Sequence, residues 1–258
     1  MSKGLLYDAT LCIGCLECER GCAKENKLPY TDALEKQKKT NEHKFTYVAV
    51  HEKEKYMRRL CMHCNDPTCV SVCPVGALQK TKLGPVVYDA AKCMGCRYCM
   101  IGCPFGIPKY EWSKAIPTVK KCVLCNERVV AGKQTACAEV CPTGATLFGE
   151  RTELLAEAHK RLRENPSNYV NHVYGESEVG GTSVMMLSSV PFEQFDLRPF
   201  APQPLPELTG RVLARIPDVV RVGVTVLGGV YWITNRRDVV ANAERVEKMR
   251  DRNPKDEK

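Results

Sequence analysis

Residues 93–104 read Cys-Met-Gly-Cys-Arg-Tyr-Cys-Met-Ile-Gly-Cys-Pro, with the cysteines spaced C-x2-C-x2-C-x3-C. Three thiolates within about seven residues can hold three corners of one iron–sulfur cubane on a tight loop. We expect the fourth cysteine, Cys103, to start a helix that points away and to bind a neighbouring cluster. Pro104 suits a turn after Cys103. A turn leaves one backbone N–H without a partner, and proline has no backbone N–H. The stretch therefore predicts a cluster-binding loop.

Three further groups of this kind account for the rest of the sixteen cysteines. Group I is Cys12, Cys15, Cys18 and Cys22; group II is Cys61, Cys64, Cys69 and Cys73; group III is Cys93, Cys96, Cys99 and Cys103; group IV is Cys122, Cys125, Cys137 and Cys141. Groups I and III share one spacing, whereas the middle gap is four residues in group II and eleven in group IV. Four complete groups predict four [4Fe–4S] clusters as cofactors.

Zinc and disulfides are the alternative roles for so many cysteines. Zinc sites normally use two well-separated cysteine pairs, and groups I and III crowd three thiolates too closely for that; only group IV alone resembles a zinc site. A disulfide scaffold would scatter its cysteines to link loops, whereas these lie in tight groups. Cluster ligation is therefore the favoured interpretation.

The residues between the ligands also favour clusters. Gly14, Gly21, Gly95 and Gly102 would allow the backbone to turn sharply and approach a cluster. Backbone amides of such loops can donate to cluster sulfurs and raise the reduction potential. His63, between two cysteines of group II, is either a tuning residue or an ordinary packed or solvated side chain.

The chain contains an internal repeat with an offset of 81 residues, from Cys12 to Cys93. Residues 5–12 match residues 86–93, and groups II and IV both begin Cys-x2-Cys-Asn and end Val-Cys-Pro-x-Gly-Ala. Each half predicts a short strand, a ligand loop, a short helix and a returning strand. The segment from groups II to III resembles a complete bacterial two-cluster ferredoxin, which leaves groups I and IV as an outer pair.

In such ferredoxins the last cysteine of each group binds the other cluster of the pair. The nested pairing then predicts four ligand sets. Set 1 is Cys12, Cys15, Cys18 and Cys141; set 2 is Cys61, Cys64, Cys69 and Cys103; set 3 is Cys73, Cys93, Cys96 and Cys99; set 4 is Cys22, Cys122, Cys125 and Cys137. A sequential pairing of groups I and II would instead give Cys73 to the first cluster. The short connection between groups II and III, and Ala23 where a proline would be expected, favour nesting.

The predicted fold class is α+β, with two nested bacterial two-cluster-ferredoxin-like domains. The outer domain comprises residues 1–54 and 111–150, including a charged linker at 23–54, and the inner domain comprises residues 55–110. Within the linker, Phe45–Val50 alternates like a strand. The remainder of the linker is expected at the surface.

A helix-strand cap is predicted for residues 151–195. Its helix would run from Thr152, as the capping residue, to Glu164, with Pro166 ending it. The apolar stripe on this helix is Leu154, Leu155, Ala158 and Leu162. Val184–Leu187 is expected to be a strand.

The last third of the chain predicts an extended arm and a membrane anchor. Residues 196–215 are proline-rich and are expected to be extended. Residues 216–235 are predicted to form a single transmembrane helix, although only 222–235 is free of charge and a buried helix is the alternative. Tyr231 and Trp232 beside an arginine pair favour the membrane.

The charged tail at 236–258 bears on sidedness. Residues 235–258 contain eight Lys and Arg, against three in 201–221, which places the tail in the cytoplasm and the body on the periplasmic or outer face. The N-terminus carries no signal segment, so the body would be exported with a partner; the alternative is the cytoplasmic face.

Composition excludes two function classes. The net charge of +8 is spread along the chain without a basic stripe interleaved with aromatics, so no nucleic-acid partner is expected. There is no Rossmann or P-loop signature, and the ligands leave no cysteine free as a nucleophile. The chain is therefore expected not to be an enzyme by itself.

Four motifs resemble one known family. They are Cys-Ile-Gly-Cys from Cys12, Cys-Met-His-Cys-Asn-Asp-Pro from Cys61, Cys-Arg-Tyr-Cys-Met-Ile-Gly-Cys-Pro-Phe from Cys96 and Cys-Pro-Thr-Gly-Ala from Cys141. With Phe148-Gly149 and Val179–Thr182, the chain resembles the iron–sulfur (beta) subunits of respiratory formate dehydrogenases and of HybA-type membrane hydrogenases. Val190-Pro191-Phe192 favours the hydrogenase branch.

The resemblance implies a non-catalytic electron-transfer subunit. Its partners would be a large catalytic oxidoreductase subunit, of the molybdenum or tungsten formate dehydrogenase type or a nickel–iron hydrogenase, and a membrane cytochrome b or quinone-reactive subunit. Membrane lipid would be contacted through the C-terminal helix. The implied electron order is set 1, set 4, set 2, set 3, with set 1 facing the catalytic subunit. The alternative is a soluble polyferredoxin that shuttles electrons between enzymes.

Overall fold

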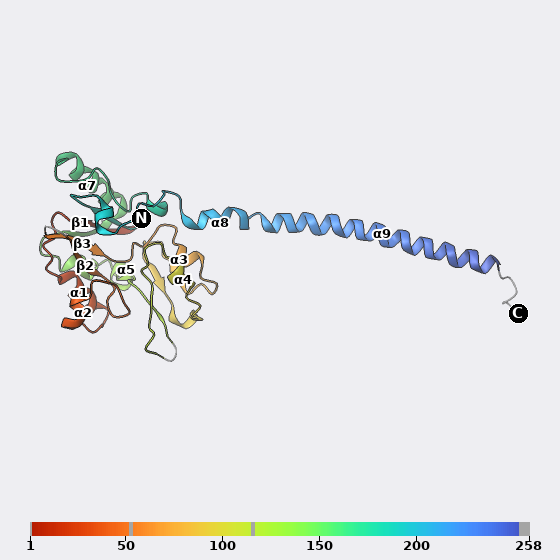
Figure 1. Cartoon of the computed structure of the whole chain (residues 1–258), viewed down its shortest axis with the longest axis horizontal. Coiled ribbons are helices and arrows are strands. Elements are labelled where there is room, and N and C mark those ends of the chain that lie inside the picture. Colours follow the sequence, from red (N-terminus) through yellow and green to blue (C-terminus); the bar gives the residue numbers. More distant parts are fainter. Residues whose placement is uncertain (1, 52–53, 115–116, 253–258) are drawn as a thin grey trace. The chain divides into compact units, whose positions relative to one another are not determined.

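The computed structural model describes residues 2–51, 54–114 and 117–252. The chain divides into two units, Met1–Glu207 and Leu208–Lys258. All sixteen cysteines lie in the first unit, and the second is helical over its described residues except for a turn at 214–215 (Figure 1).

Short strands and short helices alternate along the first unit. Its first half contains β1 (Lys3–Asp8), α1 (Glu17–Glu25), α2 (Asp32–Lys36), β2 (Tyr47–His51), β3 (Lys55–Arg59), α3 (Thr68–Ser71), β4 (Leu78–Lys80), β5 (Val86–Tyr88), η2 (Ala90–Lys92) and α4 (Tyr98–Ile101). Its second half contains β6 (Lys109–Tyr110), β7 (Val119–Lys120), α5 (Asn126–Val130), α6 (Ala136–Glu139), β8 (Thr146–Glu150), α7 (Arg151–Glu164), η3 (Glu178–Gly180), β9 (Val184–Leu187) and η4 (Phe192–Phe195). Helices α8 (Leu205–Leu213) and α9 (Ile216–Arg252) follow. The mixture agrees with the predicted α+β class.

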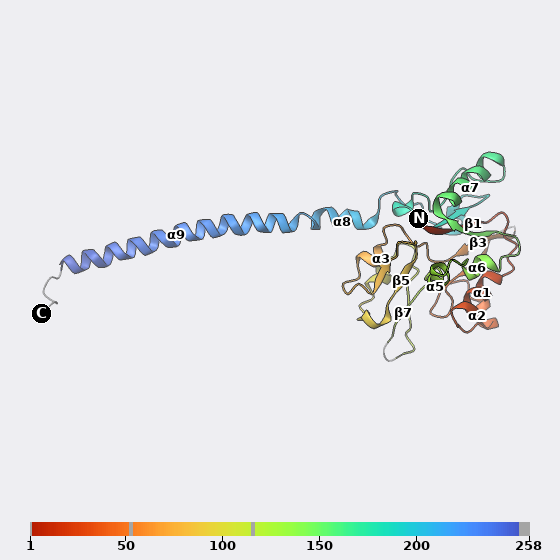
Figure 2. The ribbon, with the colours of Figure 1, turned by 180° about the vertical axis from the view of Figure 1, so that it is seen from behind.

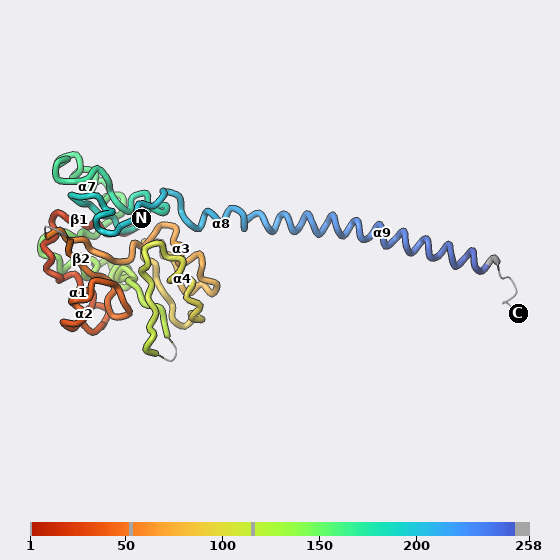
Figure 3. Tube along the Cα trace, viewed as in Figure 1, coloured from red at the N-terminus to blue at the C-terminus, as the bar shows by residue number. Residues whose placement is uncertain are grey.

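A three-stranded sheet of order β8-β1-β9 forms the centre of the first unit. β1 pairs antiparallel with β8 and parallel with β9, so the N-terminal strand runs beside residues from far along the chain (Figure 3). Side chains alternate along β1. Leu6 packs with α7, whereas Leu5 and Tyr7 pack into the core that contains the cysteines.

On the side of this sheet away from α7, the shorter helices and hairpins of the first unit form two lobes (Figures 1 and 2). α3 and the hairpins β4–β5 and β6–β7 lie together, apart from α1, α2 and α6, in both views (Figures 1 and 2). The α3 lobe has its own small apolar core around Leu78, Val86 and Tyr110. On the other side, α1 packs against α6.

Two predicted strands are confirmed, and the predicted helix is confirmed with a different start. Phe45–Val50 corresponds to β2, and Val184–Leu187 is β9. α7 begins at Arg151, its N-cap is Glu150, and no side chain caps it, so the predicted capping role of Thr152 is wrong. Thr152 already lies in the first helical turn, because the chain enters α7 directly from β8.

The expectation that the linker at 23–54 is surface is wrong at Lys44. This side chain is buried, donates to the carbonyls of Leu34, Glu35 and Gln37, and pairs with the buried Glu19 at 2.6 Å. A charge is tolerated inside a protein only when its donors and its counter-charge are satisfied together. Lys44 meets that condition and ties the linker to α1.

The predicted extended arm at 196–215 is wrong over residues 205–213, which form α8. The high proline content of residues 196–215 favours an extended chain. Pro206 instead occupies the first turn of α8, and Pro217 occupies the first turn of α9. Proline is accommodated in a first helical turn because the N–H that it lacks has no intrahelical partner there.

α9 extends well beyond the predicted anchor at 216–235. Its apolar residues, among them Val224, Leu227 and Trp232, are exposed, and arginines follow them within the same helix. By length and composition, the helical stretch Leu205–Arg250 is sufficient to cross a membrane. The predicted tail at 236–258 is helical up to Arg252, and residues 253–258 lie outside the described residues.

Candidate metal centres

Cys12, Cys15 and Cys18 line one cavity together with Cys141, with about 320 Å³ of space unfilled by protein atoms. The first three come from the loop before α1 and from α1 itself, and Cys141 follows α6. β1 ends shortly before Cys12 and β8 begins shortly after Cys141. Their antiparallel pairing brings the two segments together. These four cysteines are the members of set 1.

Cys122, Cys125 and Cys137 line a second cavity together with Cys22, with about 350 Å³ of unfilled space. Cys22 lies in α1 and Cys137 in α6, and these two helices pack against each other. Gly21 makes the contact possible, because a Cβ on it would lie 2.8 Å from the Val140 side chain. These four cysteines are the members of set 4.

Cys93, Cys96 and Cys99 line a third cavity together with Cys73, again with about 320 Å³ of unfilled space. The β4–β5 hairpin connects α3, which ends beside Cys73, to the loop of group III. Leu78 and Tyr88, register partners in this hairpin, also line the cavity. These cysteines are the members of set 3.

The cysteines of set 2 affect one another electrostatically. Burial raises the pKa of the Cys64 thiol, and Cys61, Cys103 and Cys69 raise it further. Cys64 forms an isolated β-bridge with Thr182, and the N–H of Asn65 donates to the carbonyl of Gly181 at 3.0 Å. The Gly-Gly-Thr segment therefore positions the loop that carries Cys61 and Cys64.

The expectation that the fourth cysteine of each group starts a helix is wrong. The helix begins one residue before the third cysteine, which lies in α1, α3, α4 or α6. The fourth cysteine is inside α1 in group I and lies just beyond the helix in the other groups. In groups I and III the loop enters its helix through a left-handed residue, Leu16 or Arg97. That sharp turn places the third thiol over its loop.

Two of the predicted loop glycines have the backbone conformation that glycine favours. Gly14 has φ +69° and Gly95 has φ +75°, and they are equivalent in the internal repeat. A Cβ on Gly14 would overlap the Tyr56 ring, and one on Gly95 would lie 2.7 Å from the Tyr110 hydroxyl. The loops therefore pack directly beneath an aromatic ring, with no space for a side chain.

Backbone amides point at several of the sulfurs. The N–H of Ala77 donates to Cys73 Sγ at 3.2 Å, and the N–H of Leu124 donates to Cys122 Sγ at 3.3 Å. For Cys141, burial raises the pKa, but amide donors following it outweigh burial and lower the pKa overall. These donors stabilise negative charge on sulfur, as cluster ligation requires.

His63 is buried, and its Nδ1 accepts the N–H of Val86 at 2.9 Å. Nε2 therefore carries the ring proton, and it has no hydrogen-bond partner among the described residues. Burial lowers the His63 pKa, and Lys121 and Lys80 lower it further. His63 is thus a packed, neutral side chain, and its role as a tuning residue remains a prediction.

Three cations around the cysteines were missed by sequence reasoning: the buried Arg58 and Lys121, and the half-buried Lys80. Lys80 donates to the His63 carbonyl at 2.8 Å, and its pKa is lowered by burial to about 8, against the opposing effect of Cys64 and Cys61. Lys121 donates to the carbonyls of Val86 and Cys122. No local pattern identifies these residues, because in sequence they are ordinary members of charged stretches.

Specific cysteines of one set affect the pKa of cysteines in the next set. Burial raises the pKa of Cys18 to about 12, and Cys137 of set 4 contributes to that shift. Burial likewise raises the pKa of Cys122 to about 12, with Cys61 of set 2 as the next cause. For Cys69, also about 12, the contributors after burial include Cys99 of set 3.

The arrangement fits a polynuclear cluster. Burying this many thiolates is unfavourable unless a cation compensates them. Among residues 2–51, 54–114 and 117–252, no three His, Cys, Asp or Glu converge as a site for one metal ion. The thiols instead line the walls of cavities, where they can surround a body larger than a single ion. When bound there, [4Fe–4S] clusters supply reversible one-electron reduction at potentials that the protein tunes.

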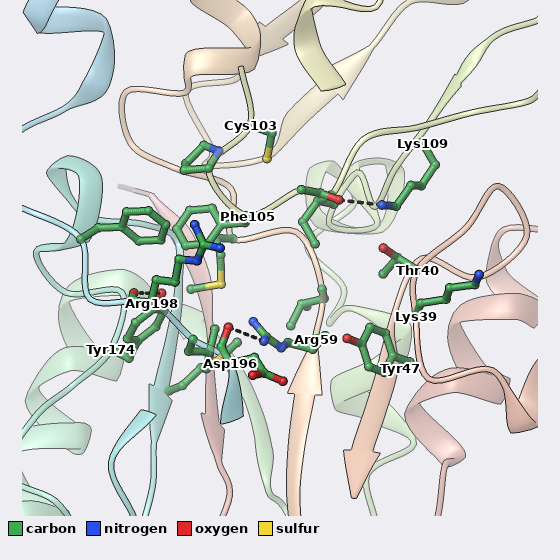
Figure 4. A pocket seen from close by; sticks show the side chains of 18 residues that line it. Lys39, Thr40, Tyr47, Arg59, Cys103, Phe105, Lys109, Tyr174, Asp196 and Arg198 are labelled. Carbon is green, nitrogen blue, oxygen red and sulfur yellow. Dashed lines mark hydrogen bonds between the residues drawn. The ribbon is translucent and has the colours of Figure 1, made fainter. Parts of the chain in front are cut away.

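A separate cleft borders Cys103 of set 2 (Figure 4). Lys39, Arg59, Lys109 and Arg198 contribute positive charge to its lining, against one carboxylate, that of Asp196. Arg59 donates to the carbonyls of Phe195 and Asp196, both at 2.7 Å, which holds the segment after β9 against β3. The cleft is therefore predominantly cationic.

Cysteine loops, amide donors and cavities of this kind define a ferredoxin-type iron–sulfur protein. Residues 52–151 match a family model described as a 4Fe-4S dicluster domain, and residues 11–77 match a second one with the same description. Two dicluster domains and sixteen cysteines support four [4Fe–4S] clusters.

Three relatives identify the family more closely. A protein of Nitratidesulfovibrio vulgaris is 40% identical, and the match covers 96% of this chain and 71% of the relative. The hydrogenase-2 operon protein HybA of Escherichia coli O157:H7 is 41% identical, covering 76% of this chain and 73% of the relative. The nitrate-inducible formate dehydrogenase iron-sulfur subunit of Escherichia coli K12 is 35% identical, covering 70% and 66%. The chain belongs to the family of HybA and the formate dehydrogenase iron–sulfur subunits.

Proposed function

We propose that this chain relays electrons from a large catalytic oxidoreductase subunit, through four [4Fe–4S] clusters, to a membrane cytochrome b or quinone-reactive subunit. The catalytic partner is of the molybdenum or tungsten formate dehydrogenase type or a nickel–iron hydrogenase. The chain itself is non-catalytic: its residues hold the clusters, exclude water from them and set their potentials. The names of the relatives support this partnership.

The neighbour pattern of the cysteines carries the proposal. The charge of Cys137 raises the pKa of Cys18, that of Cys61 raises the pKa of Cys122, and that of Cys99 raises the pKa of Cys69, so each set acts electrostatically on the next one in the order. A linear order of electrostatic neighbours suits a wire, because an electron entering at one end meets each site once. The pattern supports the order set 1, set 4, set 2, set 3.

The cavities also support the nested domains. In sets 1, 3 and 4, the four cysteines of each set line one cavity. Groups I and IV then form the outer domain, residues 1–54 and 111–150, and groups II and III form the inner domain, residues 55–110. Set 1 faces the catalytic subunit in this proposal, and set 3 lies at the opposite end.

The C-terminal helix is the proposed membrane anchor, with the body on the periplasmic or outer face. Arg221, near its N-terminal end, forms an ion pair with Asp218, which reduces the cost of placing both charges at the membrane surface. The arginines after Ile233 lie in the part of the helix that would emerge in the cytoplasm.

The test is to purify the full-length chain from its membranes with whatever accompanies it. A co-purifying molybdopterin or nickel–iron subunit, with reduction of the chain's clusters on anaerobic addition of formate or hydrogen, is expected. Paramagnetic resonance of the reduced clusters provides the readout. A chain recovered from the cytosol without a large subunit, and reduced by several unrelated enzymes, would indicate the soluble polyferredoxin instead.

A further inference from the structure

Arg58 is an almost fully buried arginine, 1% exposed, in the middle of the β2–β3 pair. Its Nε donates to Thr46 Oγ1 at 3.0 Å, and its Nη1 donates to Thr146 Oγ1 at 3.2 Å. Thr46 lies between groups I and II, whereas Thr146 follows group IV. The guanidinium is therefore held in one orientation by two hydrogen bonds that diverge from it.

These two threonines belong to the walls of different cavities. Thr46 and Arg58 line the cavity of set 4, together with Cys22 and Cys137. Thr146 lines the cavity of set 1, together with Cys18. The guanidinium thus lies in the wall of the set 4 cavity and donates a hydrogen bond to a residue that lines the set 1 cavity.

The charge of Arg58 has no carboxylate partner within salt-bridge distance among the described residues. The nearby buried acid, Glu19, is already paired with Lys44. Burial alone would lower the Arg58 pKa, but Cys137, Cys18 and Cys22 outweigh burial and raise it. Sulfurs from both set 1 and set 4 are therefore the counter-charge of this buried cation.

We propose that Arg58 is a shared tuning residue for sets 1 and 4. Its guanidinium raises the reduction potentials of both clusters and keeps the two potentials close to each other. This inference rests on the proposed function, in which those sets hold consecutive clusters. Reduction adds one electron from the donor, and so one negative charge, to a cluster. A fixed cation beside both sites stabilises the reduced form of each.

The test compares Arg58→Gln with wild type in the assembled complex, by potentiometric titration with dithionite as reductant and paramagnetic resonance as readout. At a fixed potential, the ratio of reduced to oxidised cluster at sets 1 and 4 should fall about tenfold or more, about 59 mV for a one-electron couple. Sets 2 and 3 should stay unchanged.

Two matched variants separate charge from structure. Arg59→Gln removes the same charge one residue further along β3, where the side chain contacts carbonyls at 195–196, and should leave sets 1 and 4 unchanged. Arg58→Lys keeps the charge and should shift the ratio by about twofold or less. An Arg58→Lys shift as large as that of Arg58→Gln would overturn the electrostatic role.

Thr146→Val provides a test if Arg58→Gln does not assemble, because it retains the buried arginine. Loss of the hydroxyl frees the guanidinium from the set 1 wall, so only the set 1 potential should fall. If Thr146→Val holds all four clusters and their potentials are unchanged, Arg58 is only structural. A shift of the set 4 potential alone would contradict the shared role. A wild-type chain without four clusters would instead defeat the proposed function.

Discussion

Tyr7 on β1 is the register partner of Thr146 on β8 in an antiparallel pair that joins the two ends of the cysteine-bearing region. Both residues line the cavity of set 1, and Tyr7 Oη also donates to the Tyr56 carbonyl at 3.0 Å. Backbone pairing between distant segments, rather than loop spacing, therefore brings Cys141 to Cys12, Cys15 and Cys18.

The first prediction is that Cys141→Ser damages or converts only the cluster of set 1. Cys141 is the one member of that set that comes from group IV. Electrons from the catalytic subunit would then stall at the first site, whereas dithionite would still reduce the clusters of sets 2 and 3. Paramagnetic resonance of the reduced variant is the measurement.

Cys103→Ser is the matched control, because the same chemical change should then affect set 2 and leave set 1 intact. Loss of a signal traceable to group III in Cys141→Ser, with the group I cluster intact, would show that the pairing is sequential and that the nested arrangement is wrong.

The second prediction concerns metal content. Four cubanes require about sixteen iron and about sixteen acid-labile sulfide per chain, with negligible zinc. Anaerobic purification followed by elemental and sulfide analysis measures this. Two clusters with stoichiometric zinc would overturn the assignment of group IV, whose long middle gap is the one most similar to a zinc site.

The third prediction concerns the anchor. Cutting the chain before Ile216 should leave all four clusters assembled and loosen the complex from membranes, because the last cysteine is Cys141. Full-length Leu227→Asp, which places a charge in the apolar stretch of α9, should weaken membrane attachment in the same way.

Membrane fractionation with iron analysis measures both properties. Removing only residues 253–258 is the control and should change neither. If the chain cut before Ile216 stayed membrane-bound in its complex, the partners would have to supply the anchoring.

The fourth prediction uses two glycines with positive φ. Gly14→Ala should cost about 1–2 kcal/mol for the left-handed backbone and about 1–3 kcal/mol more for the overlap with Tyr56. Gly132 has φ +73° and open space around its Cβ position, so Gly132→Ala should lose only the stability that the left-handed backbone costs. The urea midpoint for loss of visible cluster absorbance measures the difference, and equal midpoints would contradict the packing against Tyr56.

The fifth prediction concerns the ion pair of Lys44 and Glu19, whose side chains are 2% and 0% exposed. Lys44→Met should destabilise the chain by about 3–5 kcal/mol, because it leaves a buried carboxylate unpaired. Combining it with Glu19→Gln should recover part of that loss. Arg20→Met, at an exposed pair, should cost less than about 1 kcal/mol.

Urea unfolding of Lys44→Met, Glu19→Gln, the double variant and Arg20→Met gives the comparison. A double variant as unstable as the sum of the single ones would mean that Lys44 and Glu19 act independently. A loss in Arg20→Met as large as in Lys44→Met would mean that burial is not the cause.

Much of the site could be predicted from the sequence because its strongest determinants are local. Three thiolates within a few residues can surround one cubane only if the loop curls around it, and Gly14 and Gly95 have the positive φ that such a curl requires. The strands at 45–50 and 184–187 also follow from alternating or apolar runs. By contrast, Pro206 is compatible with both an extended arm and a first helical turn, so the sequence does not distinguish the two.

The sequence by itself therefore determined the cofactor class, the number of clusters, the family and some of the regular elements, since each depends on residues close together in the chain. Only the tertiary structure decided which cysteines share a cavity, because that depends on β1 pairing with β8 and on α1 packing against α6. It also decided that Lys44 is buried and that Arg58, in the wall of the set 4 cavity, donates to a residue that lines the set 1 cavity. The sequence does not show whether water or cysteine sulfurs stabilise the charge of a side chain. Only the folded chain determines which of the two surrounds it.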